Sequence, residues 1–204
     1  MTVLRAPVLA VAAVTLTLGG CGYNTIPMQH EAAKEAWANV EAQYQRRADL
    51  IPNLVATVQA SAIAERETLT QVIDARSRAT SIQLDADALS DPAAVARYQA
   101  AQGELSQALS RLMLVVERYP EVRSTASFIA LQSELEGTEN RIAVARRDYN
   151  EAARVYNTTL RTFPGNIWAS TFHSGSEPLP LFSAAPGADA APQVQFNVGS
   201  TPAQ

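Results

Sequence analysis

Hydrophobic positions recur with a helical period along most of the chain. Between Met28 and Ile82 there is no glycine and a single proline, and apolar or small residues follow one another in steps of three and four. Steps of this size place side chains on one face of an α-helix. The spacing therefore predicts helix over this region. The members of the face are Trp37, Val40, Tyr44, Ala48, Ile51, Val55, Val58, Ala62, Leu69 and Val72.

A second helical pattern begins at Ser90 or Asp91, either of which can cap a helix. Pro92 suits the first turn, because an amide there has no helical partner in any case. The pattern ends at Tyr119 and Pro120, since the residue before a proline disfavours helix. Its apolar face consists of Val95, Tyr98, Leu105, Leu109, Leu112, Val115 and Val116.

A third helix is predicted after a cap at Ser124 or Thr125, and the proline and glycine of "FPGN" at 163–166 stop it. Long amphipathic helices joined by short connections pack as a bundle. We therefore predict an all-α fold, an up-and-down bundle of three to four long antiparallel helices over residues 28–168. The third stripe runs through Phe128, Leu131, Leu135, Ile142, Tyr149, Ala153, Tyr156, Leu160 and Phe163.

Pro52 complicates the first helix, because an internal proline removes a hydrogen bond and clashes with the preceding turn. An unbroken helix over 28–82 would be roughly 80 Å long, about twice the length of the second helix. Either the chain turns back near Pro52, which makes four helices, or the helix kinks there and its overhang finds a partner. We prefer the first alternative.

The final segment, residues 169–204, is rich in proline, glycine and alanine. This composition predicts an extended or disordered tail. Within it, "QVQF" at 193–196 is suited to docking as one short extended piece.

The amino terminus carries an apolar run of about eleven residues, Val8 to Leu18, after a single charge at Arg5. The run is shorter than the roughly twenty residues that a transmembrane helix needs and fits a secretory signal. The sequence "LGGC", which ends at Cys21, resembles the lipobox of bacterial lipoproteins. We therefore expect residues 1–20 to be a cleaved signal peptide and 21–27 a lipidated tether. The alternative is an uncleaved membrane helix with an incidental cysteine.

A lipidated Cys21 anchors the protein to a membrane and leaves its body facing the periplasm or the cell exterior. Residue 22 is glycine, whereas an aspartate here would resemble an inner-membrane retention signal. In a host with two membranes we therefore expect the outer one.

Charge and residue types restrict the chemistry. The net charge of −4 argues against nucleic acid as a partner, because a nucleic-acid-binding surface is basic. In the lipobox interpretation Cys21 is committed to lipid, and His30 and His173 lie far apart in the sequence without ligand spacing. There is no glycine-rich phosphate loop. We therefore predict no metal, no cofactor and no catalytic residue.

Two charged residues lie unexpectedly close to the third apolar stripe. Glu139 and Arg146 flank Ile142, and charges in such positions should be paired. The preferred interpretation is a layer of ion pairs between helices, with Arg47 as a member. The sharper alternative is a polar pocket that binds a partner or ligand.

Several long segments resemble the LemA family: "QRRADLIPNLVATVQA" (45–60), "LEGTENRIAVARRDYNEAARVYN" (135–157), "ERYPEVRST" (117–125) and "FPGN" (163–166). The resemblance covers roughly Tyr23 to Phe196. It implies a helical bundle tethered by its amino terminus to a bacterial envelope membrane, with the body outside the cytoplasm. Many proteins of this family carry an amino-terminal transmembrane helix, whereas this chain shows a sequence that resembles a lipobox. One branch is linked to magnetosome membrane formation, which suggests membrane organisation.

These observations rank three functions. The first is a membrane-anchored scaffold or adaptor without catalytic activity, which holds a protein partner in the envelope. The second is a membrane-organising protein that self-associates, as a homo-oligomer, or acts directly on the bilayer. The third and least favoured is an envelope enzyme.

Overall fold

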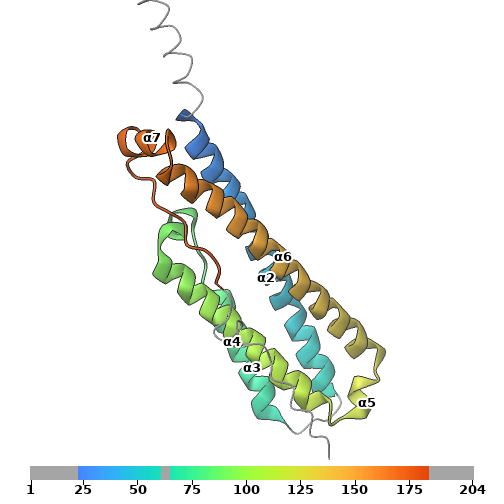
Figure 1. The fold of residues 1–204 in the computed structure, drawn as a ribbon. Coiled ribbons are helices and arrows are strands. Elements are labelled where there is room, and N and C mark those ends of the chain that lie inside the picture. Colours follow the sequence, from blue (N-terminus) through green and yellow to red (C-terminus); the bar gives the residue numbers. More distant parts are fainter. Residues whose placement is uncertain (1–22, 61–64, 184–204) are drawn as a thin grey trace, which may run out of the picture.

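The computed structural model describes residues 23–60 and 65–183. Both ranges are free of β-strand, which confirms the all-α class. The expectations for residues 1–20, for Cys21 and for "QVQF" concern residues outside these ranges. The elements are α2 (Thr25–Ala60), α3 (Arg66–Ser81), the 3-10 helix η1 (Ala86–Ser90), α4 (Pro92–Val116), α5 (Pro120–Arg123), α6 (Ala126–Arg161) and α7 (Gly165–Thr171) (Figure 1).

The helix starts follow from capping chemistry. The Asp91 side chain accepts a 2.8 Å hydrogen bond from the Ala93 amide, and Pro92 occupies the first turn of α4. At the start of α6, the Thr125 hydroxyl accepts from the Phe128 amide at 3.3 Å. Of the two candidates at each helix start, the structure uses Asp91 and Thr125.

The long helices run alternately up and down in two pairs. Figure 1 shows α2 and α6 antiparallel and side by side along the molecule, and α3 packs against α4 in the second pair. Helix α4 makes its contacts mainly with α3, η1 and α5, whereas α6 makes its contacts mainly with α2, α5 and α7. Direct contact between α4 and α6 is therefore sparse, and the two pairs are joined chiefly through α2 and α3.

The core consists of two clusters of buried apolar side chains. The cluster on the side of α7, which we call the upper cluster, surrounds Trp37 and Tyr149. The cluster toward the opposite end, which we call the lower cluster, surrounds Leu54 and Leu112. Along α2 the upper cluster ends at Tyr44 and the lower one begins at Ile51. The space between them holds polar side chains. Trp37 and Tyr44 belong to the core, as their place in the apolar stripe indicates.

Pro52 lies within α2, which continues to Ala60, so the preferred reversal of the chain near this proline was wrong. The next helix, α3, begins at Arg66, beyond the end of α2 at Ala60. Pro52 itself is exposed, and the buried Ile51 and Leu54 hold the helix on either side of it. A kink at this position stays a prediction.

The length mismatch that motivated this prediction is resolved by α6. Both α2 and α6 have 36 residues, so the long first helix is covered over its length. Helix α3 has only 16 residues, roughly 24 Å, and covers only one half of the bundle. The other half is covered by η1 and by residues beyond α7. We call residues 178–183 the strap.

Candidate functional site

The strap lies in the upper half of the space between α4 and α6 (Figure 1). It belongs to the predicted tail, yet its Leu179 and Phe182 side chains are buried in the upper core cluster. Helix α7 also extends past residue 168, where the predicted bundle ended. The first part of the predicted tail is therefore a structural component of the body.

Two asparagines of α6 recognise the backbone of the strap. Asn157 exchanges two 2.8 Å hydrogen bonds with the amide and carbonyl of Leu179. Asn150 does the same with Phe182, at 2.8 Å from its amide and 3.0 Å to its carbonyl. Seven helical residues rise about 10.5 Å and three extended residues span about 10 Å, so the two pairs are in register. The Tyr149 hydroxyl adds a 2.9 Å bond to the Pro180 carbonyl.

Phe182 is the aromatic anchor of the strap. Its ring stacks on Trp37 at 5.5 Å between centroids and meets Tyr149 edge-on at the same distance. The guanidinium of Arg146 lies 4.7 Å from the centroid of the Phe182 ring, and Arg146 Nη2 donates to the Ser183 carbonyl at 3.0 Å. The strap is thus held by side-chain packing and by backbone hydrogen bonds along its length.

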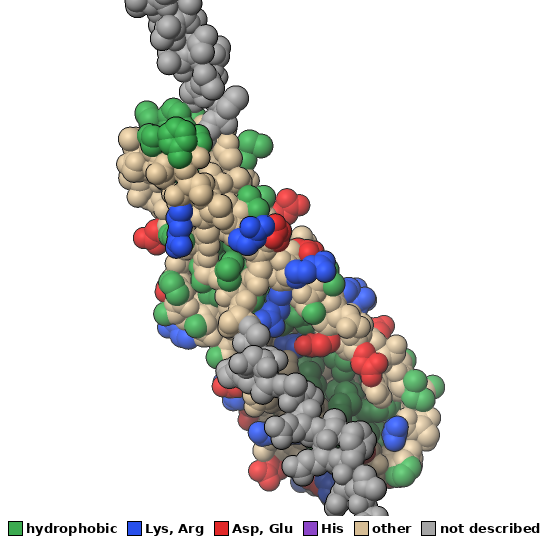
Figure 2. Space-filling model, in the orientation of Figure 1, with side chains coloured by type: hydrophobic (Ala, Val, Ile, Leu, Met, Phe, Trp, Pro, Cys, Tyr) green, Lys and Arg blue, Asp and Glu red, His purple; other side chains and the backbone are tan. Residues whose placement is uncertain are grey.

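The lower half of the space between α4 and α6 is an open groove of about 580 Å³. In Figure 2, hydrophobic side chains lie in a hollow in the lower part of the body, with acidic side chains beside it. We call it the lower groove. Its apolar lining is Leu109, Met113, Leu114 and Leu135, and its acidic lining is Glu117, Glu136 and Glu139.

A polar layer separates the strap from the lower groove. Buried Arg47 donates to Glu139 Oε2 at 3.0 Å, to Ser106 Oγ at 2.8 Å and to Gln102 Oε1 at 2.9 Å. Gln102 in turn donates to the Ala79 carbonyl at 3.2 Å. The layer therefore links α2, α3, α4 and α6 between the two core clusters.

Of the three charged residues predicted to form one layer between helices, only two pair with each other. Arg47 and Glu139 form an ion pair across α2 and α6, although the Arg47 side chain is 3% exposed and that of Glu139 61%. Arg146 does not join this pair and holds the strap instead. Tyr44 lies between the two arginines, with the Arg47 guanidinium 5.1 Å from its ring centroid. Burial raises the pKa of Tyr44, and the charges of Arg146 and Arg47 oppose that shift.

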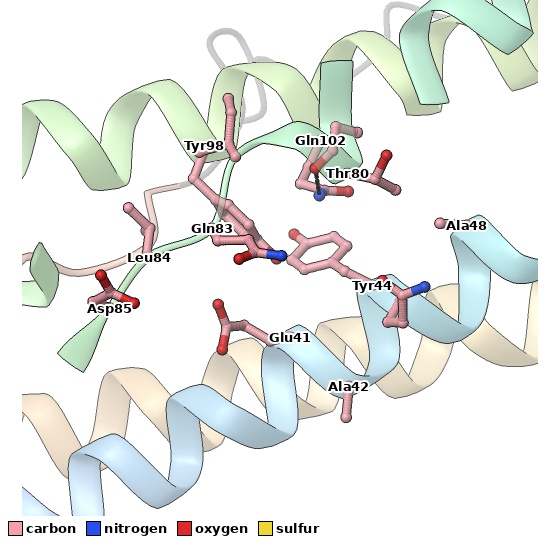
Figure 3. A pocket seen from close by; sticks show the side chains of 13 residues that line it. Glu41, Ala42, Tyr44, Ala48, Thr80, Gln83, Leu84, Asp85, Tyr98 and Gln102 are labelled. Atoms are coloured by element: carbon pink, nitrogen blue, oxygen red, sulfur yellow. Dashed lines mark hydrogen bonds between the residues drawn. The ribbon is translucent and has the colours of Figure 1, made fainter. Parts of the chain in front are cut away.

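A second hollow, of about 400 Å³, opens between α2 and the segment that follows α3 (Figure 3). Glu41, Asp85, Tyr98 and Gln83 lie around it. Burial is the main cause that raises the pKa of Glu41, and the charge of Asp85 adds to it. Burial likewise raises the pKa of Tyr98. Two carboxylates and a phenol offer hydrogen bonds to a small polar molecule, but the hollow contains no nucleophile paired with a base.

The two histidines are engaged at the end of the bundle. The His30 ring lies 5.2 Å from that of Tyr156, and His173 Nε2 is 3.2 Å from the Tyr23 carbonyl oxygen. Across residues 23–60 and 65–183, no three His, Cys, Asp or Glu side chains gather as metal ligands.

The contacts of the strap were not predicted from the sequence. Asn150 and Asn157 lie seven residues apart on one helix face, a spacing that was available in "DYNEAARVYN". Phe182 was not recognised as a core residue, because the proline- and glycine-containing sequence around it shows no helical pattern. Only the fold shows that this segment returns along α6.

The family of this chain follows from comparison with known proteins. The model of the LemA family matches residues 36–196. This chain belongs to the LemA family. Two similar relatives are the magnetosome proteins MamQ 2 and MamQ 1 of Paramagnetospirillum magneticum, each 31% identical over 198 residues, 89% of this chain and 72% of theirs.

The magnetosome protein MamQ of Magnetospirillum gryphiswaldense is 28% identical over 183 residues, 82% of this chain and 66% of its own. The match to the family includes the strap and both asparagines, since all lie within residues 36–196. None of the helices in residues 23–60 and 65–183 has the length and apolar character needed to cross a membrane.

Proposed function

We propose that this LemA-family protein is a membrane-anchored scaffold of the bacterial envelope that binds a partner protein in the lower groove. The lipidated Cys21 of the lipobox-like sequence would supply the anchor, with the body on the periplasmic or outer side, at the outer membrane where there are two. Similarity to magnetosome proteins supports a role at a membrane. Binding, without chemistry of its own, is the function that we assign to the body.

The observation that carries this proposal is the unequal filling of the space between α4 and α6. The upper half holds an extended segment, with Leu179 and Phe182 buried and their backbone bound by asparagines. The lower half continues the same space and exposes apolar side chains, of which Leu114 is 65% accessible. Exposed apolar grooves of this kind mark interaction sites.

Charge identifies the chemistry of the occupant. The lower groove contains three glutamates, of which Glu139 alone is paired with Arg47. An extended apolar segment with a lysine or arginine beside it complements this lining. The chain's own residues 184–204 contain no lysine or arginine and one aspartate, so they lack this complementarity. The proposed occupant is therefore a basic-flanked apolar segment of another protein.

Site-specific photocrosslinking in intact native cells tests the proposal. A photoreactive residue replaces Leu114 in the full-length chain, and a matched chain carries it at Ile73, an exposed apolar position on α3 outside the groove. We expect a specific adduct from position 114 only, with the crosslinked peptide apolar and flanked by a basic residue. Glu136→Lys should abolish that adduct, because it reverses one charge of the lining.

Three results would count against the scaffold. They are an adduct within residues 184–204 of the same chain, equal adducts from positions 114 and 73, and an adduct that Glu136→Lys leaves unchanged. The first would make the lower groove a site for the chain's own terminus.

A further inference from the structure

One end of the bundle carries no formal charge. Residues 23–30 and 162–176 include no Asp, Glu, Lys or Arg, although charged residues make up 18% of the chain. These two stretches form the start of α2 and the region around α7, which lie together at the same end (Figure 1). In Figure 2, hydrophobic side chains gather at this end, and acidic and basic side chains lie farther along the body. We call it the α7 end.

Large apolar side chains project from the α7 end. Phe163 is 79% exposed, Phe172 is 63% exposed, and Met28, Ile167 and Tyr23 are also exposed. Monomeric soluble proteins rarely expose several large apolar side chains together to water. They lie together with the uncharged stretches 23–30 and 162–176, so an apolar or interfacial neighbour suits this surface.

The aromatic rings at this end support one another. The Tyr23 ring lies 6.2 Å from that of Trp168 and 5.8 Å from that of Phe172, both nearly edge-on. Trp168 and Phe172 are 5.5 Å apart. This packing joins the first described residue of the chain to α7, so the surface is a preformed cap and not a set of independent side chains.

We propose that the α7 end is a lipid-contact surface that sits on the bilayer. Tyrosine and tryptophan favour the interface between headgroups and acyl chains because their rings are amphipathic, and phenylalanine is buried on the apolar side of that interface. The position in the chain supports this neighbour, because the apolar run that ends at Leu18 precedes Tyr23 by only five residues. Any membrane attachment through that run brings the α7 end to the bilayer first.

Contact at this end orients the bundle. Helix α6 leaves the α7 end at Arg161 and reaches Glu136 of the lower groove 25 residues away, roughly 38 Å along the helix axis. With the α7 end seated on lipid, the lower groove is held well above the headgroups. The surface binds lipid independently of any groove partner, so this inference goes beyond the scaffold function.

Tryptophan quenching by lipid tests the contact. The full-length protein is reconstituted into phosphatidylcholine vesicles with and without brominated acyl chains, and vesicle flotation verifies that it is bound. Trp168 lies in the cap, whereas Trp37 is buried in the core, so brominated lipid should quench Trp168 alone. We expect quenching in the native chain and its loss in Trp168→Phe.

Substitution of two exposed phenylalanines then tests how much they strengthen the contact with lipid. The double variant Phe163→Ser, Phe172→Ser should lower the ratio of lipid-bound to unbound α7 ends by about tenfold. Each substitution removes part of the apolar side-chain area that is buried in the lipid. Ile73→Ser with Ile129→Ser is the matched control, because both isoleucines are exposed apolar residues outside the cap. The control pair should quench like the native chain.

Equal emission with and without brominated lipid, in protein that floats with the vesicles, would overturn the proposal. It would also be overturned if the phenylalanine pair abolished a dimer seen by chemical crosslinking while quenching was absent throughout. A second copy of the chain would then be the occupant. Neither result bears on the lower groove, whose crosslinking test uses positions far from this end.

Discussion

The polar layer should be stabilised by the buried hydrogen bonds of Arg47 far more than by its ion pair. Glu139 is 61% exposed, so its carboxylate keeps most of its hydration when the arginine is absent. An ion pair with so exposed a partner contributes about 0–1 kcal/mol. Glu139→Gln should therefore lower the free energy of unfolding by less than about 1 kcal/mol.

Arg47→Met keeps much of the aliphatic volume and removes every donor. Gln102 Oε1 then remains buried with no other donor among its observed contacts, and an orphaned buried acceptor costs about 1–3 kcal/mol. The Ser106 contact at 2.8 Å is also lost, while the desolvation cost of the guanidinium is relieved. We expect a net loss of about 2 kcal/mol.

Urea denaturation of the full-length protein in detergent micelles, followed by tryptophan emission, measures both variants. In a thermal melt of the same protein, Arg47→Met should have a melting temperature roughly 4–8 °C lower, because a chain of this size shifts by about 2–4 °C per kcal/mol. The reasoning is refuted if Glu139→Gln destabilises as much as Arg47→Met, since the ion pair would then dominate. It is equally refuted if Arg47→Met lies within about 0.5 kcal/mol of the native protein, which is the range of ordinary surface substitutions.

Three further predictions concern the strap, the second hollow and the anchor. Phe182→Ala should lower the free energy of unfolding by about 3 kcal/mol and shift Trp37 emission, because it empties a packed aromatic site. Ile129→Ala, at an exposed apolar position outside the cap, should lower it by less than about 0.5 kcal/mol in the same denaturation assay; equal losses would show that the strap is not part of the core. Burial raises the pKa of Glu41, so the folded state binds its proton more tightly than the unfolded state and the ionised form opposes folding at neutral pH. Glu41→Gln should thus stabilise the protein modestly at pH 7, and this gain should vanish below the ordinary pKa of 4.5; a gain that persists at low pH would contradict the assignment. Cys21→Ser should abolish metabolic lipid labelling and leave an uncleaved precursor, whereas unchanged labelling and processing would exclude the lipobox.

The sequence alone determined the parts of this protein that depend on local periodicity. Steps of three and four mark a helix face wherever the helix lies, so the stripe through Trp37 and Tyr44 predicted buried residues correctly. Capping is equally local, and Asp91 and Thr125 were both among the predicted caps. The family, too, was recognisable from motifs along the chain. The position of Glu139 beside an apolar stripe indicated a charge in need of a partner, and the fold supplies Arg47.

Only the tertiary structure decided where the helices end in space and what lies between them. Pro52 is tolerated inside α2 because the helix is buried against α6 on either side of it, and local propensity does not contain that energy. The strap was not predictable from its composition, because its stability comes from Asn150, Asn157 and Trp37, which are distant in sequence. The lower groove follows from the same non-local cause: helix pairing leaves α4 and α6 apart, and among the described residues the strap fills only the upper half of the space between them.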